Sequence, residues 1–487
     1  MSLVTARPCF CAYNRTMDIR TPRNVKLSAF YRRSFAFRTV RDRLPVILTK
    51  TIDSLSQQKD DIAKEYGNEA REDIKNVIGK LSRLKYEIQT NKPLKNIRSK
   101  ASDANTYNEF IRERDSQEGP PTPFHSVWLL VECYMYRKIW EAFEKTKFLK
   151  EFDPFQTNKE KLFHSSIDQM KETIAYLQKI TETPSPNKDE FFMLLQMNLW
   201  SNKCDLSLHP DGVNPVLTNQ INELSDKILV NDSEKVWNAL IDSSGDVVDI
   251  VLDNAGAELI ADLALADYLI KKGICKKVNF HVKKIPWFIS DVTLKDFKWT
   301  IEQLSKMYEE PLVQSTGDAW SKNFENLNWT IKTSDFWTLP VEYAHMHKYD
   351  RILYEELSLS KLIFLKGDVS FRKLFREINY NPEAPVAEAQ GFFGPSKICS
   401  IRTIKSEIIC GFPKGLADKC EIENKKWMET GEYGVIQFSD KIVPLMEESE
   451  LKIFSNLLPV IKSGESAMSM WAGIIAVAAD TSCLCRN

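Results

Sequence analysis

The stretch VVDIVLDNAGAELIADLALADYLI, residues 247–270, decides the fold class of this chain. Its first positions are mostly apolar and predict a buried strand over Val247–Leu252, and Ala255–Lys271 continues as a long apolar helix pattern. Asp253 and Asn254 stand side by side where the strand gives way to the helix. A buried carboxylate is costly unless it is paired or binds a metal, so this placement needs a reason.

The same order of strand and helix continues downstream. Short apolar runs predict further strands at Lys277–His281, at Leu362–Leu365 and within Arg402–Phe412. Leu294–Met307 has the apolar spacing of a helix. Because alternating strands and helices imply a parallel sheet with crossovers, we predict an α/β fold with a mostly parallel sheet. The 17 glycines in 487 residues are too few for an all-β fold rich in tight turns.

The part of the chain before this alternation has a helical pattern. Apolar residues recur at helical spacing from about Ser34 to Asn231, interrupted by a loop at Gly119–Pro123. We expect four segments: a basic, disordered N-terminal extension over 1–33, a helical region over 34–235, an α/β core over 236–440 and an atypical C-terminal tail over 441–487.

Polar residues follow three of the predicted strands or apolar runs. Asp253 with Asn254, then Asp291, then Asp368 each come directly after such a run. In parallel sheets, ligands gather beyond the carboxyl ends of the strands. Each residue alone is compatible with a helix N-cap, for which Asp and Asn are favoured, and that interpretation stays open. Three together favour a site at one edge of the sheet.

These side chains suit a hard metal and phosphate chemistry. Carboxylate and amide oxygens of Asp253, Asn254 and Asp291 are ligands for Mg²⁺ or Mn²⁺, and such an ion polarises a phosphoryl oxygen. Helix N-termini at Ala255 and near Val292 would add backbone donors for an anion. Arg372 and Lys405 are candidates to neutralise the phosphoryl group, with a surface ion pair as the alternative for both.

Several other function classes are excluded by charge and by motif. The 66 basic and 67 acidic residues nearly cancel, which argues against nucleic acid or an anionic membrane as partner. Neither a P-loop nor a G-x-G-x-x-G fingerprint occurs, and H-E-x-x-H is absent. The pair His345 and His347 is more typical of a loop or strand than of a zinc site.

Cysteine usage and the lack of targeting signals indicate a soluble, cytoplasmic protein. We expect the singly placed Cys133, Cys204, Cys275 and Cys410 to be small buried apolar residues rather than a disulfide framework. The two C-x-C pairs, Cys9/Cys11 and Cys483/Cys485, lie near the termini and fit fraying tails better than a metal or disulfide cluster.

The two ends of the chain leave other compartments open. The arginine-rich N-terminus is similar in charge to a mitochondrial presequence but lacks helical periodicity, and a nuclear location is equally compatible. The apolar run Met468–Ala479 is shorter than the roughly 20 residues that a membrane span needs.

Six motifs in order along the chain resemble the damage-control phosphatase family. They are SFAFRTVRDRLPVILTKTID (34–53), NLWSNKCDLS (198–207), VLDNAGAELIADLALADYLI (251–270), IPWFISDVTLKDF (285–297), LKGDVSFRKL (365–374) and RTIK (402–405). The chain is most similar to the eukaryotic subfamily with a C-terminal R-T-x-K motif, described both as sugar phosphate phosphatases and as acidic residue methyltransferases. The resemblance extends from about Ser34 to Phe438.

The resemblance implies a three-layer α/β/α sandwich preceded by a helical N-terminal region. It implies hydrolysis of phosphomonoesters such as fructose 1-phosphate and fructose 6-phosphate, with Mn²⁺ or Ni²⁺, or else Co²⁺ or Mg²⁺. By motif, Asp253, Asn254 and Asp291 fall on the catalytic metal ligands. The implied substrate-binding positions are these three together with Glu258, Gly367, Asp368, Val369, Ser370, Phe371, Arg372 and Lys405.

The sequence departs from the family pattern near the substrate positions. Ser370 and Phe371 replace the usual Asn-Tyr of G-D-x-N-Y-R, and Ser201 replaces the usual Gly of L-W-G-N-K. The metal ligands match the family pattern, so the resemblance implies the same chemistry. The substrate preference is less certain to be shared, because the departures lie at substrate positions. The alternative function is methylation of protein glutamates with S-adenosylmethionine, which would require a protein substrate. The phosphatase is favoured, because three hard oxygens suit phosphate better than methyl transfer and no glycine-rich loop follows the first strand.

Overall fold

A seven-stranded sheet forms the centre of the α/β part. The computed structural model describes residues 16–202 and 221–445 of the chain. The strands lie in the order β1-β7-β6-β5-β2-β3-β4. Their bounds are β1 Ile228–Asn231, β2 Val247–Val251, β3 Lys277–Val282, β4 Trp329–Thr333, β5 Leu362–Lys366, β6 Ile398–Thr403 and β7 Gly434–Ser439. Only the β6–β7 pair is antiparallel, so the predicted α/β fold with a mostly parallel sheet is confirmed.

The central strands β2 and β5 are mostly apolar because both of their faces are covered. Every residue of β5 is buried, as are the last four of β2. The register places Val251 opposite both Leu365 of β5 and His281 of β3. The loops that leave these three strands therefore emerge at one edge of the sheet.

The order of the strands marks a switch point between β2 and β5. From β2 the chain proceeds outward through β3 to β4, whereas β5 and β6 lie on the other side of β2. In open α/β sheets the crevice for ligands forms at such a point, beyond the carboxyl ends of the strands. Asp253 follows β2 and Asp368 follows β5, so both stand at the two sides of this crevice.

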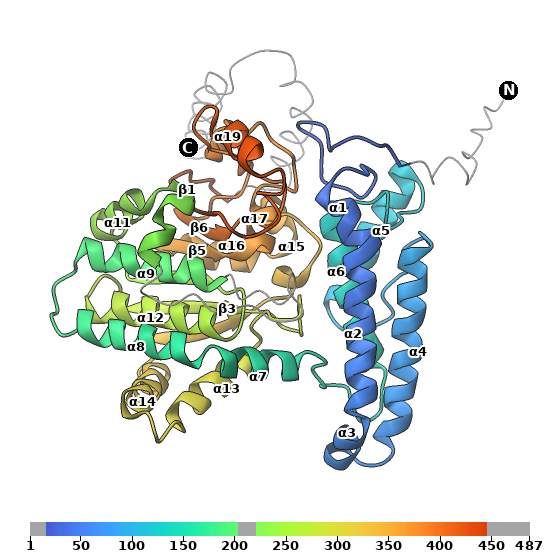
Figure 1. Cartoon of the computed structure of the whole chain (residues 1–487), viewed down its shortest axis with the longest axis horizontal. Helices are drawn as coiled ribbons and strands as arrows, with labels where there is room; N and C mark the ends of the chain where they lie inside the picture. The colour runs from blue at the N-terminus through green and yellow to red at the C-terminus, as the bar shows by residue number, and fades with distance from the viewer. Residues whose placement is uncertain (1–15, 203–220, 446–487) are drawn as a thin grey trace, which may run out of the picture. The chain divides into compact units, whose positions relative to one another are not determined.

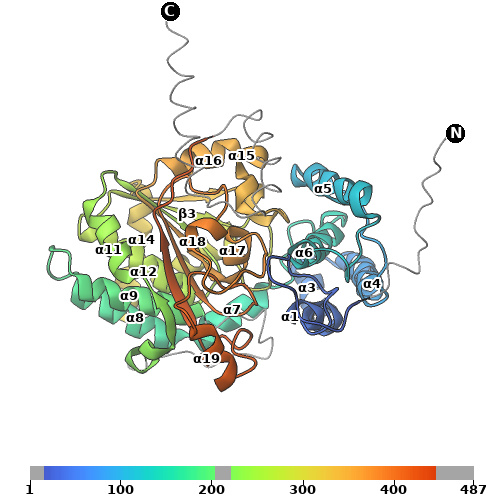
Figure 2. The ribbon, with the colours of Figure 1, turned by 90° about the horizontal axis from the view of Figure 1, so that it is seen from above.

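Helices cover both faces of the sheet, as Figures 1 and 2 show. One layer contains α8 and α9, which pack on α12, together with α11, α13 and α14. Its bounds are α8 Ile167–Ile180, α9 Lys188–Ser201, α11 Ser233–Asp242, α12 Ala257–Lys271, α13 Leu294–Ser305 and α14 Pro311–Glu325. The opposite layer contains α15 Met346–Tyr349, α16 Arg351–Ser358, α17 Gly367–Leu374 and α18 Val386–Ala389. α12 is buried along almost its whole length, which explains its lack of a polar face.

The N-terminal helices form a separate bundle at the right of Figure 1. In it α2 packs against α4, and α4 packs against α6. The bounds are α1 Phe35–Arg38, α2 Leu44–Gln57, α3 Lys59–Tyr66, α4 Ala70–Gln89, α5 Asp103–Glu118 and α6 Trp128–Glu144, with a π-helical turn, η2, at Thr39–Arg43. Helix α7, Gln156–Ser165, leads from this bundle to the sheet.

The remaining short elements connect strands or follow them. They are the 3₁₀ turns η4 Asn222–Lys227, η5 Asp335–Thr338 and η6 Tyr343–His345, and the helix α19 Leu416–Glu423. η5 and η6 lie between β4 and α15, and α19 lies between β6 and β7.

The segment boundaries differ from those expected from sequence. Residues 16–33 are not a free extension: Leu27 and Ala29 are fully buried, and the Leu27 N–H donates to the Glu377 carbonyl. The helical region expected over 34–235 divides in two, because α8 and α9 belong to the layer on the sheet and β1 lies before residue 235. One compact unit ends at Val443, close to the expected start of the tail.

Some expectations concern residues outside those described. They are the two C-x-C pairs, Cys204 and the apolar run Met468–Ala479. Cys133, Cys275 and Cys410 are free and buried, as predicted. Within residues 16–202 and 221–445, no helix combines the length and the apolar character that crossing a membrane requires.

Candidate active site

Backbone pairing brings the loop after β3 against the end of β2. Asn254 and Asp291 form an isolated antiparallel bridge. On either side of it, the Val292 N–H donates to the Asp253 carbonyl and the Ala255 N–H donates to the Ser290 carbonyl, both at 2.8 Å. Two residues far apart in the chain therefore stand side by side because their main chains are bonded, not only because their strands are neighbours.

Two amides orient the Asp253 carboxylate. Asn202, at the end of α9, and Asn254 each donate an Nδ2 hydrogen bond to Asp253 Oδ2 at 2.9 Å. The same two amides donate to Glu258 Oε2, at 2.8 and 2.9 Å. Ser290 in turn donates to Asn254 Oδ1 at 2.6 Å. Neutral amide donors thus fix the orientation of both buried carboxylates without adding charge.

Gly367 allows the start of α17 to approach Asp253. Its φ is 81°, and a Cβ at this position would lie 2.0 Å from Asp253 Oδ2. Both the backbone conformation and the contact exclude any larger residue. The G-D segment after β5 can therefore lie directly against the acid that follows β2.

The loop that carries Asp291 is strained. Phe288 and Ile289 have positive φ values of 39° and 72°, which bulky and β-branched residues rarely adopt. Ser290 N–H bonds back to the Phe288 carbonyl, as in a γ-turn centred on Ile289. Backbone strain of this kind costs roughly 1–3 kcal/mol and gathers at functional sites. Lys283 Nζ lies 3.2 Å from Asp291 Oδ2 and gives that carboxylate a cationic neighbour.

Asp368 holds the turn after β6 in place. Arg402 Nη1 donates to Asp368 Oδ1 at 2.7 Å, and Ser406 donates to the same oxygen at 3.0 Å. The Arg402 guanidinium also lies 3.6 Å from the centre of the Phe371 ring. Burial lowers the pKa of Arg402, and the Asp368 charge opposes that shift. The Arg of R-T-x-K is therefore a support beneath the site.

Lys405 reaches back to the end of α9. Its Nζ donates to the Asn202 carbonyl at 2.8 Å and to Asn202 Oδ1 at 3.1 Å. Thr403 donates to the same Oδ1 at 2.7 Å. Asn202 thereby connects the cation on one side of the site to Asp253 on the other.

Arg372 is fixed by two carboxylates and one ring. Its guanidinium pairs with Glu132 of α6 at 2.5 Å and with Glu377 at 2.8 Å, and it stacks on Trp128 at 3.6 Å from the ring centre. Burial by itself would lower the pKa of Arg372, but the Glu377 and Glu132 charges raise it above its ordinary value. The side chain is a permanently charged, immobile fork.

Behind the site, a buried ionic cluster connects α12 to β5. Lys366 Nζ lies 2.8 Å from Glu258 Oε1 and 3.0 Å from Asp262 Oδ1, and all three side chains are inaccessible to solvent. Asn198 also donates to Asp262 Oδ1, at 2.7 Å. Burial raises the pKa of Asp262 to about 6, although Lys366 opposes that shift. Glu258 thus belongs to both the cluster and the amide network around Asp253.

These side chains surround one cavity, and the sequence prediction includes seven of the residues that line it. The lining consists of Arg43, Trp128, Asp253, Asn254, Phe288, Asp291, Asp368, Val369, Arg372 and Lys405. The predicted Glu258, Gly367, Ser370 and Phe371 lie outside the lining. Ser370 bonds the Tyr343 side chain, and Phe371 packs under Arg402, so the two departures from the family pattern fall beside the cavity wall.

Sequence reasoning missed the residues that come from other elements. Arg43 ends the π-helical turn η2, Trp128 begins α6 and Phe288 belongs to the strained loop. Asn202, which bonds both Asp253 and Lys405, was also missed. Arg43, Asn202 and Phe288 lie inside quoted motifs, and that was the only signal available for them.

The donor set fits a hard divalent metal. Asp253, Asn254 and Asp291 line the same cavity, whose volume of about 20 Å³ suits a single water or ion. Two carboxylates and an amide oxygen are the ligand type that Mg²⁺ or Mn²⁺ prefers. Among the described residues, no group of three or more His, Cys, Asp or Glu side chains is placed to hold a metal. The amide oxygen of Asn254 would therefore complement the two carboxylates as a ligand.

Comparison with known proteins identifies the family. The damage-control phosphatase ARMT1-like domain matches residues 39–420 of this chain. The chain belongs to this family. Damage-control phosphatase ARMT1 of Danio rerio is 40% identical over 432 residues, which cover 85% of this chain and 96% of that protein. The Homo sapiens protein of the same name is 38% identical over 424 residues, covering 83% and 96%.

The family match confirms the resemblance and includes the whole candidate site. Every lining residue from Arg43 to Lys405 lies within residues 39–420. A solved structure of a DUF89 family protein from Pyrococcus horikoshii is also similar, with a TM-score of 0.37 and 15% identity, covering 70% of this chain and 92% of that one. Ser201, one of the departures described from sequence, is buried and donates to the Met197 carbonyl at 2.7 Å within α9.

Proposed function

We propose that this chain is a metal-dependent phosphatase acting on the phosphomonoesters of small sugar phosphates, with fructose 1-phosphate and fructose 6-phosphate as substrates. One observation carries the proposal: a single cavity at the switch point of the sheet holds hard oxygen ligands and three cations, Arg43, Arg372 and Lys405. Hydrolysis of a phosphate ester needs both the oxygen ligands, which would hold a metal, and the cations, which neutralise the phosphoryl charge. Membership of a phosphatase family supports the same reaction class.

Different residues of the site would bind the metal and the phosphate. Asp253, Asn254 and Asp291 would hold Mn²⁺ or Ni²⁺, with Co²⁺ or Mg²⁺ as further candidates. When bound, such an ion polarises a phosphoryl oxygen and lowers the pKa of its water. Arg372, held by Glu132 and Glu377, presents fixed donors to the phosphoryl oxygens, and fixed donors need no reorganisation as charge develops. Lys405 adds a second positive charge, positioned by Asn202.

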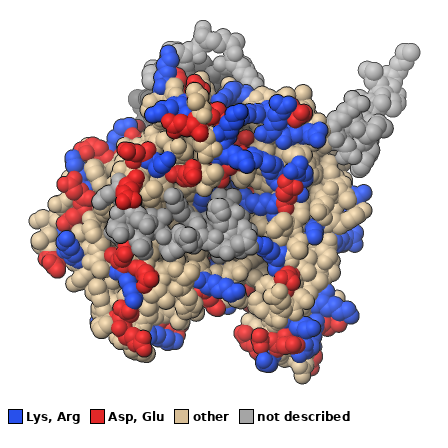
Figure 3. Space-filling view, in the orientation of Figure 1, with Lys and Arg blue, Asp and Glu red and all other residues tan. Residues whose placement is uncertain are grey.

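A basic surface of the molecule also favours an anionic substrate. Figure 3 shows Lys and Arg gathered where the N-terminal segment approaches α19. A hollow of about 620 Å³ there is lined by Arg20, Arg23, Arg33, Arg38, Lys425 and Lys426, against three glutamates. Arg38 of this hollow and Arg43 of the cavity belong to one helical stretch. A positive surface of this kind raises the encounter rate of phosphorylated molecules.

Substrate entry requires the cavity to widen. Its volume of about 20 Å³ is far below the roughly 300–1,000 Å³ of ligand pockets. Arg43 and Trp128 form the wall from the helical bundle, and the remaining lining residues belong to the α/β part. We expect the bundle wall to move away when a sugar phosphate binds and to exclude water when it returns.

The runner-up function, methylation of protein glutamates from S-adenosylmethionine, is less well supported. The loop after β2 contains a single glycine, Gly256, and carries the oxygen ligands where a cofactor-binding loop would need close backbone approach. Transfer of a labelled methyl group to a protein carboxylate, without phosphate release, would favour it.

The test is phosphate release from fructose 1-phosphate with and without Mn²⁺. Wild type should turn over only with metal, and Asp253→Ala should lose at least about 100-fold in kcat. Asp246→Ala, at an exposed position just before β2, is the matched control and should keep wild-type activity. Equal turnover in Asp253→Ala and wild type would contradict the site.

A further inference from the structure

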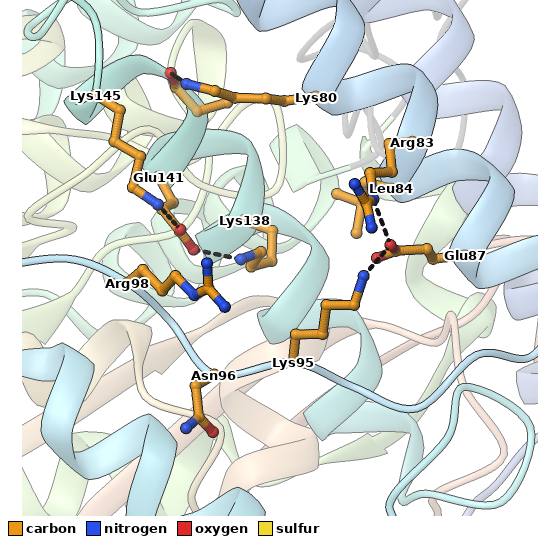
Figure 4. A pocket seen from close by; sticks show the side chains of 11 residues that line it. Lys80, Arg83, Leu84, Glu87, Lys95, Asn96, Arg98, Lys138, Glu141 and Lys145 are labelled. Carbon is orange, nitrogen blue, oxygen red and sulfur yellow. Dashed lines mark hydrogen bonds and ion pairs between the residues drawn. The ribbon is translucent and has the colours of Figure 1, made fainter.

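A second cavity lies within the helical bundle. It is bordered by the C-terminal half of α4, the extended segment 92–98 and the C-terminal half of α6, and its volume is about 360 Å³ (Figure 4). It has no lining residue in common with the catalytic cavity. Its size falls within the range of small-molecule sites, roughly 300–1,000 Å³.

The cavity has a strong excess of positive charge. Six cations line it: Lys80, Arg83, Lys95, Arg98, Lys138 and Lys145. Only two carboxylates, Glu87 and Glu141, accompany them, which leaves a formal excess of four positive charges. The whole chain is almost neutral, with a net charge of −1, so this local excess is not a general property of its surface.

Each carboxylate is already shared by two cations. Glu87 pairs with Arg83 and Lys95, and Glu141 pairs with Lys138 and Lys145. Burial raises the pKa of both acids, but their lysine and arginine partners outweigh it and lower the pKa overall. The acids are therefore fully engaged and cannot balance the remaining cations.

Two cations are left without a carboxylate. Lys80 donates only to the Ala142 carbonyl, at a long 3.3 Å, and burial together with the nearby Lys145 lowers its pKa. Arg98 makes no ion pair or hydrogen bond with any described residue, and Figure 4 shows its guanidinium pointing toward Lys138 and Glu141. Both side chains are exposed, and like charges gathered around one cavity raise the local concentration of anions.

We propose that this cavity binds a small molecule carrying two or more phosphate groups. A phosphate ester carries about −1.5 to −2 charges at neutral pH, so two of them match the excess of four. The only apolar side chains among the described lining residues are Leu84 and Ala142, and none is aromatic. The cavity can therefore recognise phosphate groups, but its described lining offers no aromatic ring on which a base could stack. This favours a bisphosphorylated sugar or an inorganic polyphosphate over a nucleotide or a nucleic-acid strand.

The test measures binding of inorganic triphosphate and of fructose 1,6-bisphosphate by calorimetry. Titrations use Asp253→Ala, so that the catalytic site does not consume the probe. Adding Lys80→Gln and Arg98→Gln should weaken binding at least about 10-fold, since each removes a charge-assisted contact. The control pair Lys276→Gln and Lys306→Gln removes the same charge at exposed positions of the α/β part and should leave the Kd unchanged.

A second readout separates a binding role from a structural one. Neither Lys80 nor Arg98 pairs with a carboxylate, so their removal should not lower the Tm of the free protein, while the Tm rise with triphosphate should disappear. A lowered Tm with unchanged affinity would overturn the proposal. So would probe binding that is lost only in Lys405→Ala, which would assign it to the catalytic cavity. Binding of a single-stranded oligonucleotide but not of triphosphate at these residues would also overturn it.

Discussion

Gly367 fixes the distance between two strand ends. It lies at the start of α17 with its Cα against the Asp253 carboxylate, and no other residue type fits there. The positive φ adds a second, independent requirement for glycine. The close contact and the positive φ can be separated experimentally, because other glycines of the chain have a positive φ without a close contact.

Gly367→Ala should therefore damage the site far more than a matched change elsewhere. Gly273 also has a positive φ, of 66°, but a Cβ there meets nothing within 4 Å. We expect Gly273→Ala to cost about 1 kcal/mol of unfolding free energy and no activity. Gly367→Ala should displace Asp253 and lower kcat by about 100-fold or more. Comparable activity losses in the two variants would show that backbone strain, not the contact, matters.

At this scale, the sequence predicted the residues that follow strong strands and missed those that arrive from elsewhere. Asp253, Asn254 and Asp291 follow apolar runs, and their position can be inferred from the parallel sheet alone. Arg43 and Trp128 reach the same cavity through the packing of a helical bundle. No periodicity in the sequence encodes that packing. Asn202 looks like any polar residue at a helix end until its two partners are known.

At the scale of elements, the strong strands were predictable and the weak ones were not. β2 and β5 are mostly apolar and buried, whereas β3 alternates apolar residues with the buried polar residues Asn279 and His281. β4 is half-buried along most of its length, and β1 has only four residues, so neither has a distinctive pattern. The strand expected within Arg402–Phe412 was misplaced: β6 begins at Ile398 and ends at Thr403, and residues 404–412 contain no strand.

The ionic cluster between α12 and β5 predicts a pH dependence of stability. The folded-state pKa of Asp262 is about 6, above its ordinary value of 3.8. Between these values the folded state binds more protons than the unfolded state, so the contribution of Asp262 to stability falls as pH rises through this window. Replacing this acid with a neutral amide should remove the decline.

Asp262→Asn should thus gain stability relative to wild type as the pH rises from about 4 to about 6.5. Chemical denaturation across this range, with Asp246→Asn as the exposed control, measures the difference in unfolding free energy. The control curve should run parallel to that of wild type. If the unfolding free energy of Asp262→Asn also runs parallel to that of wild type, the Asp262 carboxyl does not titrate between about pH 4 and about pH 6.5.

At the scale of the whole molecule, the candidate site depends on contact between the bundle and the α/β part. Arg43 ends η2 and faces residues that follow β2, β3 and β5. Glu132 of α6 pairs with Arg372 of α17 and lies 4.0 Å from Arg43, which extends the same contact. The helical bundle therefore contributes to the wall of the candidate site, although the proposed metal ligands all belong to the α/β part.

Arg43→Gln should reduce kcat/KM for fructose 1-phosphate by about 10- to 100-fold, the value of one charge-assisted contact to phosphate. Arg41→Gln is a close control, since Arg41 lies two residues away, is exposed and pairs with Asp42. It should behave as wild type in activity and in Tm. Equal kcat/KM for Arg43→Gln and wild type would remove the bundle from the site.

The place of β7 in the sheet has a consequence for synthesis of the protein. β7 lies between β1 and β6, yet it is the last strand of the described chain. While a ribosome is still translating the preceding residues, β1 has no hydrogen-bonding neighbour and β6 presents an open edge. At about 5–20 residues per second, the nascent chain spends many seconds in this state after β1 emerges. A premature stop codon shortly before residue 434 would leave the edges of β1 and β6 permanently unpaired. Messenger RNAs with such a codon should therefore yield aggregates rather than a shortened enzyme.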